Sequence, residues 1–325
     1  MAPIQRKNAS KKSLEPKETV KVPKDEKLPK ISSVEPKPYV NFKMPWGKIV
    51  TRFALSMLMV FAVYWNSKKD IEHVFASQKQ SLQLLTAEVP CSDSYKKDVS
   101  KFKDCAPKQC GRLVTDIVVS PEEASHLLRV CKKGLAFGGS NGGASILDLH
   151  SGALSEGNAF TNIYKKLKAS SAKNVFTVDD FKVYSNVRKK IQQIISYHFG
   201  VPANKLYLTH PTFFSEMTTR SAKTTHDEYW HVHVDKQTYP SFHYTSLLYL
   251  TDYGVDFSGG RFIFVDERNN ATVEPRLGRV SAFTSGAENP HYVERVSSGV
   301  RYAMTVSFTC DPEFAIRDPT MAKFQ

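Results

Sequence analysis

The pattern of apolar and polar positions changes along this chain and divides it into regions of different structure. Residues 49–65, IVTRFALSMLMVFAVYW, are almost continuously apolar. Two later stretches, residues 67–90 and 179–199, carry apolar residues at roughly helical spacing. From Lys205 onward, short segments rich in Tyr, Phe, Val and Thr alternate with turn residues. We therefore predict helices in the first two thirds of the chain and strands in the last third.

The apolar run at residues 49–65 is long enough, at the lower limit, to cross a membrane. A buried core helix and the apolar part of a signal peptide are the alternatives. The run follows 48 residues, and Trp46, Tyr64 and Trp65 stand near its ends, where an aromatic belt would lie. Arg52 could reach the membrane surface with its long side chain. We predict a single transmembrane signal-anchor helix at residues 49–66.

Three helices are predicted after the anchor. Ile71, Val74, Phe75, Leu82 and Leu85 suggest a helical stem within a stem and cysteine-bearing segment, residues 67–118. The sequence Ser-Pro-Glu-Glu at residues 120–123 is a capping box that would open a helix reaching about residue 131. Residues 179–199 form an amphipathic helix that ends at a glycine. We predict a helical support region at residues 119–204.

Five predicted strands follow in the sequences KLYLTHPTFF, HYTSLLYLTDY, GGRFIFVDE, RVSAFTS and RYAMTVSFTC. Their length and spacing are typical of an all-β barrel or a double-sheet jelly roll. We predict that residues 205–312 form this domain and that residues 313–325 form a C-terminal tail. The fold class is therefore α+β.

Positive charge is concentrated at the N-terminus. The first 48 residues contain twelve Lys and Arg against five acidic residues, a surplus of seven out of a formal net charge of +13. This proline-rich and lysine-rich stretch is predicted to be a disordered basic tail. Because the rest of the chain is only mildly basic, the charge does not indicate a nucleic-acid partner. The charge before the anchor places the tail in the cytosol and the remaining chain in a lumen, as in a type II membrane protein.

The cysteines and one glycosylation motif agree with a lumenal location in the endoplasmic reticulum or Golgi. All five cysteines (Cys91, Cys105, Cys110, Cys131, Cys310) follow the anchor, and their number leaves at least one thiol without an intrachain partner. Such clustering is typical of disulfides in an oxidising compartment. Asn270-Ala271-Thr272 is an acceptor for N-linked glycan if it lies on a surface loop.

Candidate metal ligands lie within the β region. His233 and Asp235 form an H-x-D pair, which by itself is weak evidence. His291 follows beside a predicted strand, and Arg301 begins the last strand. On a strand, His233 and Asp235 would share one face, but His231 would share it too and is the rival first ligand.

Two histidines and one carboxylate are the ligands of non-haem Fe(II) oxygen chemistry, because they leave coordination positions open. Two of these positions could chelate a 2-oxo acid, and the third could take O2. An arginine can hold the far carboxylate of the acid with its planar guanidinium. The set His233, Asp235, His291 and Arg301 therefore predicts a 2-oxoglutarate-dependent dioxygenase that releases succinate and CO2.

Residues 205–312 resemble the prolyl 4-hydroxylase-type catalytic domain of the 2-oxoglutarate oxygenases. The motifs that carry the resemblance are His233-Val234-Asp235, Tyr249-Leu250-Thr251, Ser258-Gly259-Gly260, Pro275-Arg276-Leu277-Gly278-Arg279, and His291 with Arg301. The resemblance implies a double-stranded β-helix core, iron held by the triad, and 2-oxoglutarate bound by Arg301 with Tyr249. It also implies dependence on ascorbate and a protein substrate hydroxylated on proline or lysine.

Two other functions compete with this interpretation. A lumenal glycosyltransferase would also have a type II anchor, but the chain contains no D-x-D metal motif and its site region is rich in strands. A non-catalytic β-barrel that binds a ligand is the second alternative. Iron-dependent conversion of 2-oxoglutarate to succinate would separate both from a dioxygenase.

Overall fold

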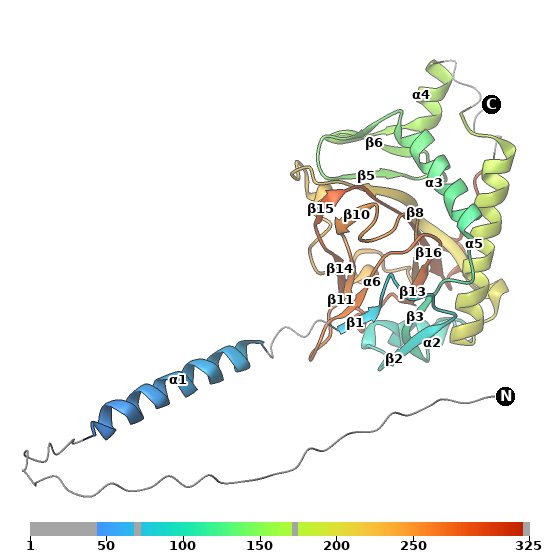
Figure 1. Ribbon diagram of the computed structural model, residues 1–325. Helices are drawn as coiled ribbons and strands as arrows, with labels where there is room; N and C mark the ends of the chain where they lie inside the picture. The colour runs from blue at the N-terminus through green and yellow to red at the C-terminus, as the bar shows by residue number, and fades with distance from the viewer. Residues whose placement is uncertain (1–43, 68–72, 171–174, 321–325) are drawn as a thin grey trace, which may run out of the picture. The chain divides into compact units, whose positions relative to one another are not determined.

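The computed structural model describes residues 44–67, 73–170 and 175–320 (Figure 1). The predicted disordered tail lies outside the described residues except for residues 44–48, and residues 321–325 of the predicted C-terminal tail also lie outside them. Contacts divide the chain into two units, residues 1–63 and 64–325. All strands of the described residues belong to the second unit.

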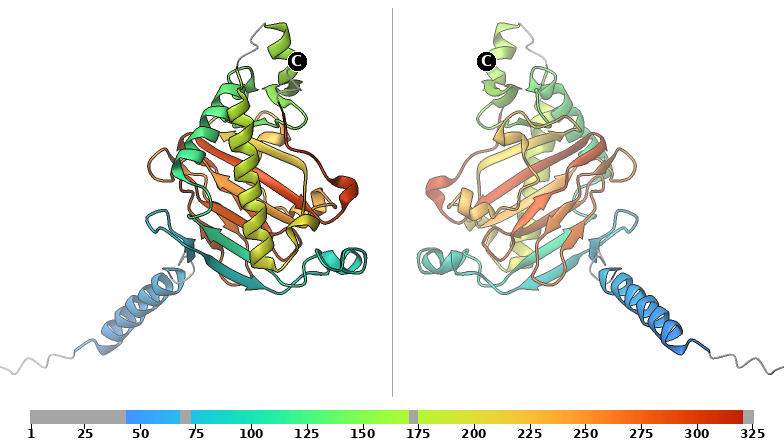
Figure 2. Two further views of the ribbon diagram at one scale, coloured as in Figure 1. Left: turned by 90° about the vertical axis from the view of Figure 1, so that its right-hand side faces the viewer. Right: turned by 90° about the vertical axis from the view of Figure 1, so that its left-hand side faces the viewer.

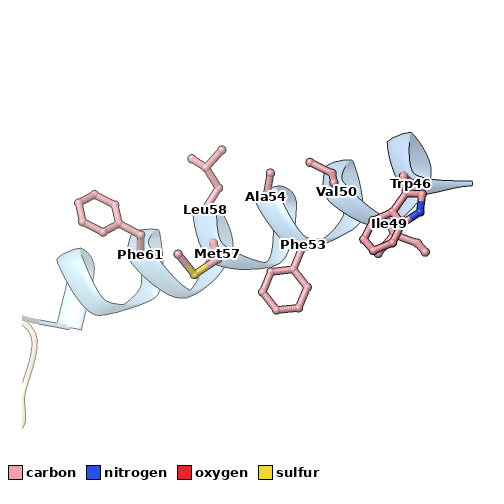
Figure 3. A pocket seen from close by; sticks show the side chains of 8 residues that line it. All are labelled: Trp46, Ile49, Val50, Phe53, Ala54, Met57, Leu58 and Phe61. Atoms are coloured by element: carbon pink, nitrogen blue, oxygen red, sulfur yellow. The ribbon is translucent and has the colours of Figure 1, made fainter.

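Helix α1, Trp46–Ser67, coincides with the predicted anchor. Its segment Trp46–Trp65 has a mean hydropathy of 1.5 and is not buried. Apolar side chains such as Phe53, Leu58 and Phe61 project from it on several sides (Figure 3). Within the described residues, this is one helix whose length and composition would allow it to cross a membrane.

The second unit is a jelly roll built on one large and one small sheet. The large sheet has the order β2-β3-β13-β9-β16-β8-β5-β6-β4, and β7 pairs with β6. The ranges of its strands are β2 Leu85–Val89, β3 Cys110–Thr115, β4 Gly139–Ser140, β5 Ala144–Leu147, β6 Ala153–Gly157, β7 Ala159–Asn162, β8 Tyr207–Met217, β9 Tyr244–Tyr249, β13 Val280–Thr284 and β16 Arg301–Thr309.

The smaller sheet has the order β1-β12-β11-β14, with β1 His73–Ala76, β11 Phe262–Phe264, β12 Ala271–Val273 and β14 His291–Val293. A separate ribbon pairs β10, Phe257–Gly259, with β15, Val296–Gly299. The five predicted strands after Lys205 are all present, as β8, β9, β11, β13 and β16. The short strands β10, β12, β14 and β15 lie between them.

Alternating residues of the large sheet serve two separate cores. Leu248, Ala282 and Met304 face the helices, whereas Leu247 and Phe283 face the small sheet. The helices are α3 Pro121–Leu135 and α5 Val178–Phe199, and α5 runs across the large sheet (Figure 2). The shorter helices are α2 Lys96–Lys101, α4 Ile163–Ala169 and α6 Asp235–Thr238. One face of the sheet is thus closed by helices, and the other is free to form a cavity against the small sheet.

The two predicted support helices are confirmed. Ser120 caps α3 by accepting a hydrogen bond from the Glu123 N–H, and the Glu123 side chain accepts one from the Ser120 N–H. The helix extends to Leu135, beyond the predicted end. Helix α5 ends at Gly200, which has a positive φ of 64° that suits glycine. The strands β4–β7 of residues 139–162 were not predicted.

The predicted helical stem is wrong over residues 73–90. These residues form β1 and β2 and the connection between them. β1 pairs in parallel with β12, and β2 pairs antiparallel with β3. Phe75, Leu82 and Leu85 pack against the core between the two sheets. The apolar spacing fits a helix, but backbone pairing with distant strands determines the structure instead.

Two disulfides connect the cysteine-bearing segment to itself and to the end of β16. Cys91 is bonded to Cys110, and Cys105 is bonded to Cys310. Cys131 carries a free thiol and is buried in α3. The second disulfide closes a separation of 205 residues, so it joins the segment before α3 directly to the last strand.

Candidate functional site

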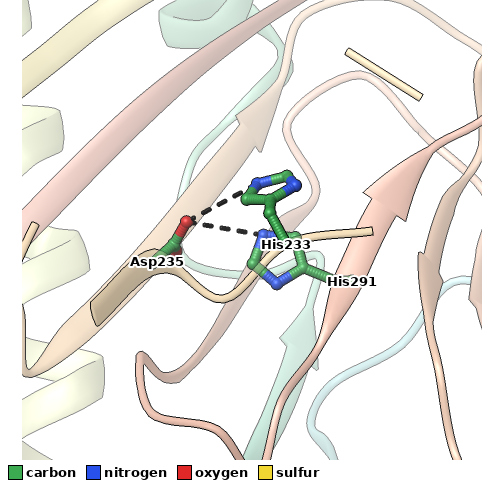
Figure 4. A group of neighbouring side chains, drawn as sticks. All are labelled: His233, Asp235 and His291. Atoms are coloured by element: carbon green, nitrogen blue, oxygen red, sulfur yellow. Dashed lines mark ion pairs between the residues drawn. The ribbon is translucent and has the colours of Figure 1, made fainter. Parts of the chain in front are cut away.

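His233, Asp235 and His291 lie close together (Figure 4), and all three line one cavity between the two sheets. His233 and His291 are directly opposite each other, since the N–H of each donates to the carbonyl of the other at 3.0 Å. Asp235 Oδ1 lies 3.7 Å from His233 Nε2 and 3.6 Å from His291 Nε2. One ligand atom from each of the three side chains therefore lies within 4.8 Å of the others.

Backbone carbonyls orient both imidazoles. His233 Nδ1 lies 3.0 Å from the His231 carbonyl, and His291 Nδ1 lies 2.9 Å from the Asn289 carbonyl. Because a carbonyl only accepts, each Nδ1 carries a proton, and each Nε2 lies on the side of Asp235, where a neutral ring presents its lone pair. The second oxygen of Asp235 accepts a hydrogen bond of 2.6 Å from Thr245 Oγ1. All three groups are held by outer contacts of the kind that orient metal ligands.

The surroundings of the two histidines differ. His291 is buried, and its ring stacks on Phe262 with centroids 4.9 Å apart. Burial lowers the pKa of His291, although Asp235 raises it, so the ring is held neutral. The side chain of His233 is 44% exposed, so the site is open to solvent beside this ring. A neutral imidazole is the form that binds a metal ion.

His231 is not a member of this group, so the hypothesis that it faces inward is wrong. Its side chain is 66% exposed, and its Nε2 pairs with Glu228 Oε2 at 2.9 Å. The strand assumed for residues 231–235 is replaced by one isolated bridge at His233 and the short helix α6 that begins at Asp235. The structure brings His233 and Asp235 together without the strand on which their shared face was predicted.

Arg301 lies at the start of β16 and lines the same cavity as the three side chains. It is completely buried. Its Nε donates to the Gly260 carbonyl at 2.8 Å, and its Nη1 lies 3.5 Å from Met217 Sδ. Within the described residues, Nη2 has no hydrogen-bond partner. A buried guanidinium with an unused donor fits an anionic ligand such as a carboxylate.

Tyr249 lies beside Arg301 but does not line the cavity. Its ring centroid is 5.5 Å from the Arg301 guanidinium carbon, and its hydroxyl lies 3.3 Å from Ser281 Oγ. Burial raises the pKa of Tyr249, so its hydroxyl stays protonated. The structure places it as a neighbour of Arg301 and shows no direct opening to the cavity for it.

The cavity has a volume of about 300 Å³. It is lined by residues from both sheets: Pro211, Phe213, Ser215, Met217, Tyr229, His233, Asp235, Thr238, Tyr239, Phe242, Thr245, Leu247, Phe262, Phe283, His291, Val293, Arg301, Thr305 and Ser307. Sequence analysis missed Thr245 and Ser307. Their positions on the strands could have indicated them. Thr245 stands two residues before Leu247 on β9, and Ser307 stands six residues after Arg301 on β16. Side chains separated by an even number of residues on a strand lie on the same face.

The fold and this site define a class, and comparison with known proteins agrees with it. Residues 218–309 match the family described as "2OG-Fe(II) oxygenase superfamily". The range includes the three candidate ligands and Arg301. The chain belongs to this superfamily, and it is a 2-oxoglutarate-dependent dioxygenase with Fe(II) and 2-oxoglutarate as its cofactor and cosubstrate.

Particular relatives are similar over most of the chain. "2-oxoglutarate and iron-dependent oxygenase domain-containing protein 3" of Mus musculus is 51% identical over 279 residues, which cover 85% of this chain and 88% of the mouse protein. The Xenopus tropicalis protein of the same name is 54% identical over 251 residues, covering 77% of this chain and 78% of that protein. "Prolyl 3-hydroxylase 1" of Gallus gallus is 30% identical over 237 residues, covering 65% of this chain and 30% of that protein.

Proposed function

We propose that His233, Asp235 and His291 hold the iron and that Arg301 binds the far carboxylate of 2-oxoglutarate. The observation that carries this assignment is that one cavity contains both the three converging ligands and a buried arginine with an unused donor. Two imidazoles and one carboxylate suit Fe(II), since they leave positions for the cosubstrate and O2. When bound, the iron and 2-oxoglutarate supply the oxidation that inserts oxygen into a substrate C–H bond, with release of succinate and CO2.

The protein's own residues orient this chemistry. The carbonyls of His231 and Asn289 fix the two rings, and Thr245 holds one oxygen of Asp235. The apolar residues Phe262 and Phe283 line the interior of the cavity. Tyr249 supports Arg301 through its ring, and we assign it to the binding of the cosubstrate only through this contact.

We further propose that the chain is a type II membrane protein whose dioxygenase domain lies in the lumen of the endoplasmic reticulum or Golgi. Helix α1 has the length and hydropathy of an anchor, and the positive surplus lies before it. The two disulfides suit an oxidising compartment. Asn270 is exposed just before β12, where a glycan could be attached.

The proposed substrate is a protein side chain, proline or lysine, and ascorbate is the proposed supporting reductant. The relatives named prolyl 3-hydroxylase 1 support a protein substrate. The exposure of His233 supports it too, because the metal site opens to solvent beside that ring. Ascorbate rests on the resemblance to the prolyl 4-hydroxylase-type domain alone.

The test is anaerobic titration of the full chain in detergent with Fe(II) and 2-oxoglutarate. We expect the charge-transfer absorption of an iron-bound 2-oxo acid, and then succinate when O2 is admitted. The Asp235→Ala variant serves as the blank. The assignment fails if the wild-type chain produces no more succinate than this variant.

A further inference from the structure

The cavity has two ends, defined by strand β16. Arg301 and Ser307 both line it, and they are six positions apart on this strand. Six residues of a strand span about 20 Å. Arg301 therefore marks one end of the cavity, and Ser307 marks the other.

Ser307 lies on the metal side of the sheet. It is directly opposite Thr245 of β9, and opposite residues in an antiparallel pair point to the same face. Thr245 Oγ1 donates to Asp235 Oδ2 at 2.6 Å. Ser307 is thus a neighbour of Thr245, whose hydroxyl holds the Asp235 carboxylate. Both residues lie away from Arg301.

The Ser307 hydroxyl has no bonding partner. The residue is completely buried, and within the described residues its Oγ has no hydrogen bond. A buried hydroxyl without a partner is unfavourable, so natural proteins rarely leave one in this state. At the opposite end, the Arg301 guanidinium also has a buried donor without a hydrogen-bond partner within the described residues, and it fits 2-oxoglutarate. The two unpaired groups therefore mark two different ligands.

The walls near Ser307 are apolar and aromatic. Phe242 lies near Ser307, because the N–H of the next residue, His243, donates to the carbonyl of Phe308 at 2.9 Å. Tyr239 and Phe242 stack with ring centroids 4.8 Å apart and an angle of 22° between the rings. Pro211 and Phe213 line the cavity as well. Among the described lining residues, the Asp and Arg side chains are Asp235 and Arg301, both already assigned, and there is no Lys or Glu. A charged substrate group would find no counter-ion at the Ser307 end.

We propose that Ser307, Tyr239 and Phe242 form the subsite that receives the substrate to be oxidised, called here the Ser307 subsite. The subsite receives an uncharged part of the substrate that has apolar surface and carries an amide. This amide forms a hydrogen bond with Ser307 Oγ. This inference rests on the proposed function, because it uses the same metal site. It narrows the substrate class, since a protonated lysine side chain does not fit the subsite.

The experiment measures peptide binding without turnover. The full chain in detergent is loaded with Mn(II), which replaces the iron, and with 2-oxoglutarate. The probes are pentapeptides with acetylated and amidated ends, in one pool with uncharged central residues and in two pools with central Lys or central Asp. Water-proton relaxation at the Mn(II) reports binding close to the metal, and equilibrium dialysis reports binding of 2-oxoglutarate in the same samples.

The variants are Ser307→Ala and Ser307→Cys, with Ser246→Ala as the matched control. Ser246 is a buried serine on β9 whose Oγ donates to the Val306 carbonyl at 3.0 Å, and it does not line the cavity. We expect the uncharged pool to bind the wild type at least about tenfold more tightly than the charged pools. Ser307→Ala and Ser307→Cys should each weaken that binding about tenfold, the effect of one lost hydrogen bond. Ser246→Ala should leave it unchanged.

Failure of the subsite and failure of the proposed function give different results. If 2-oxoglutarate does not bind the wild-type chain, the proposed function itself is wrong. If it binds, the subsite is overturned by any of three results. In the first, the uncharged pool binds the wild type and both Ser307 variants equally tightly. In the second, the charged and uncharged pools bind the wild type equally tightly. In the third, no pool binds.

Discussion

At the scale of single residues, the site depends on which atom of each histidine is left free. The carbonyls of His231 and Asn289 occupy the two Nδ1 atoms, so both Nε2 lone pairs point at Asp235. The outer contacts therefore orient the three groups as ligands for one metal ion.

Loss of Asp235 should abolish the metal site. In Asp235→Ala, two imidazoles remain, and we expect Fe(II) affinity to fall by more than about a hundredfold, since the loss of outer-shell contacts alone costs 10–100-fold. His231→Ala is the control, because it removes an exposed ring and keeps the carbonyl that orients His233. Anaerobic Fe(II) titration measures both. Equal affinity of Asp235→Ala and wild type would refute the ligand assignment.

Loss of Arg301 should affect the cosubstrate and spare the metal. In Arg301→Ala, the affinity for 2-oxoglutarate should fall roughly 10- to 150-fold, the range of a charge-assisted hydrogen bond. The control is Arg261→Ala, because Arg261 pairs with Glu294 at 2.7 Å and does not line the cavity. Equilibrium dialysis with labelled 2-oxoglutarate measures the change. An Arg301→Ala chain that binds 2-oxoglutarate like wild type would remove Arg301 from this role.

At the scale of elements, a buried arginine joins β1 to the start of β13. Arg279 is completely buried and donates to Asp116 at 2.8 Å. It also donates to the carbonyls of Ser77 and Gln80, which follow β1. This contact fixes the residues that we had predicted to be a helical stem.

Removal of its carboxylate partner should destabilise the fold strongly. Asp116→Ala leaves the guanidinium of Arg279 buried without its charge partner, which costs about 3–5 kcal/mol of unfolding free energy. Asp93→Ala is the control, because Asp93 is exposed and pairs with the exposed Lys96. Denaturant unfolding of both variants gives the comparison. A loss below about 1 kcal/mol in Asp116→Ala would show that the ion pair does not hold β1 in place.

Elements with strong local signals were predictable from the sequence. The Ser120 capping box and the glycine after α5 marked helix ends correctly, and runs rich in Tyr, Phe, Val and Thr marked five strands of the jelly roll, β8, β9, β11, β13 and β16. Strand β1 could not be predicted, because its partner β12 lies almost two hundred residues away and supplies the hydrogen bonds that local spacing cannot show. In the site, His233, Asp235, His291 and Arg301 were predicted together. The exclusion of His231 required the tertiary structure, and so did the finding that the Ser307 hydroxyl has no hydrogen-bond partner within the described residues.

At the scale of the whole molecule, residues 1–63, which include most of helix α1, and residues 64–325, which contain the dioxygenase domain, are separate units, and both disulfides belong to the second unit. The Cys105–Cys310 bond connects the segment before α3 with the end of β16, the strand that also carries Arg301. Oxidising conditions therefore stabilise the same unit that contains the site.

Asn8-Ala9-Ser10, before the apolar run, is a second acceptor motif. The proposed orientation predicts glycosylation at Asn270 and not at Asn8. When produced in cells, the Asn270→Gln chain should migrate faster than wild type by the shift of one glycan. The Asn8→Gln chain should migrate like wild type. Endoglycosidase digestion followed by electrophoresis measures this. A glycan on Asn8 would contradict the proposed membrane orientation.

The central claim is that one metal ion lies between His233, Asp235 and His291 with 2-oxoglutarate reaching Arg301. Crystals of the full chain grown with Mn(II) and 2-oxoglutarate, measured for anomalous scattering at the manganese edge, test it most directly. We predict one strong anomalous peak in contact with His233 Nε2, His291 Nε2 and Asp235 Oδ1, and density for a carboxylate at Arg301 Nη2. A manganese peak away from these three atoms, or 2-oxoglutarate bound elsewhere, would contradict it.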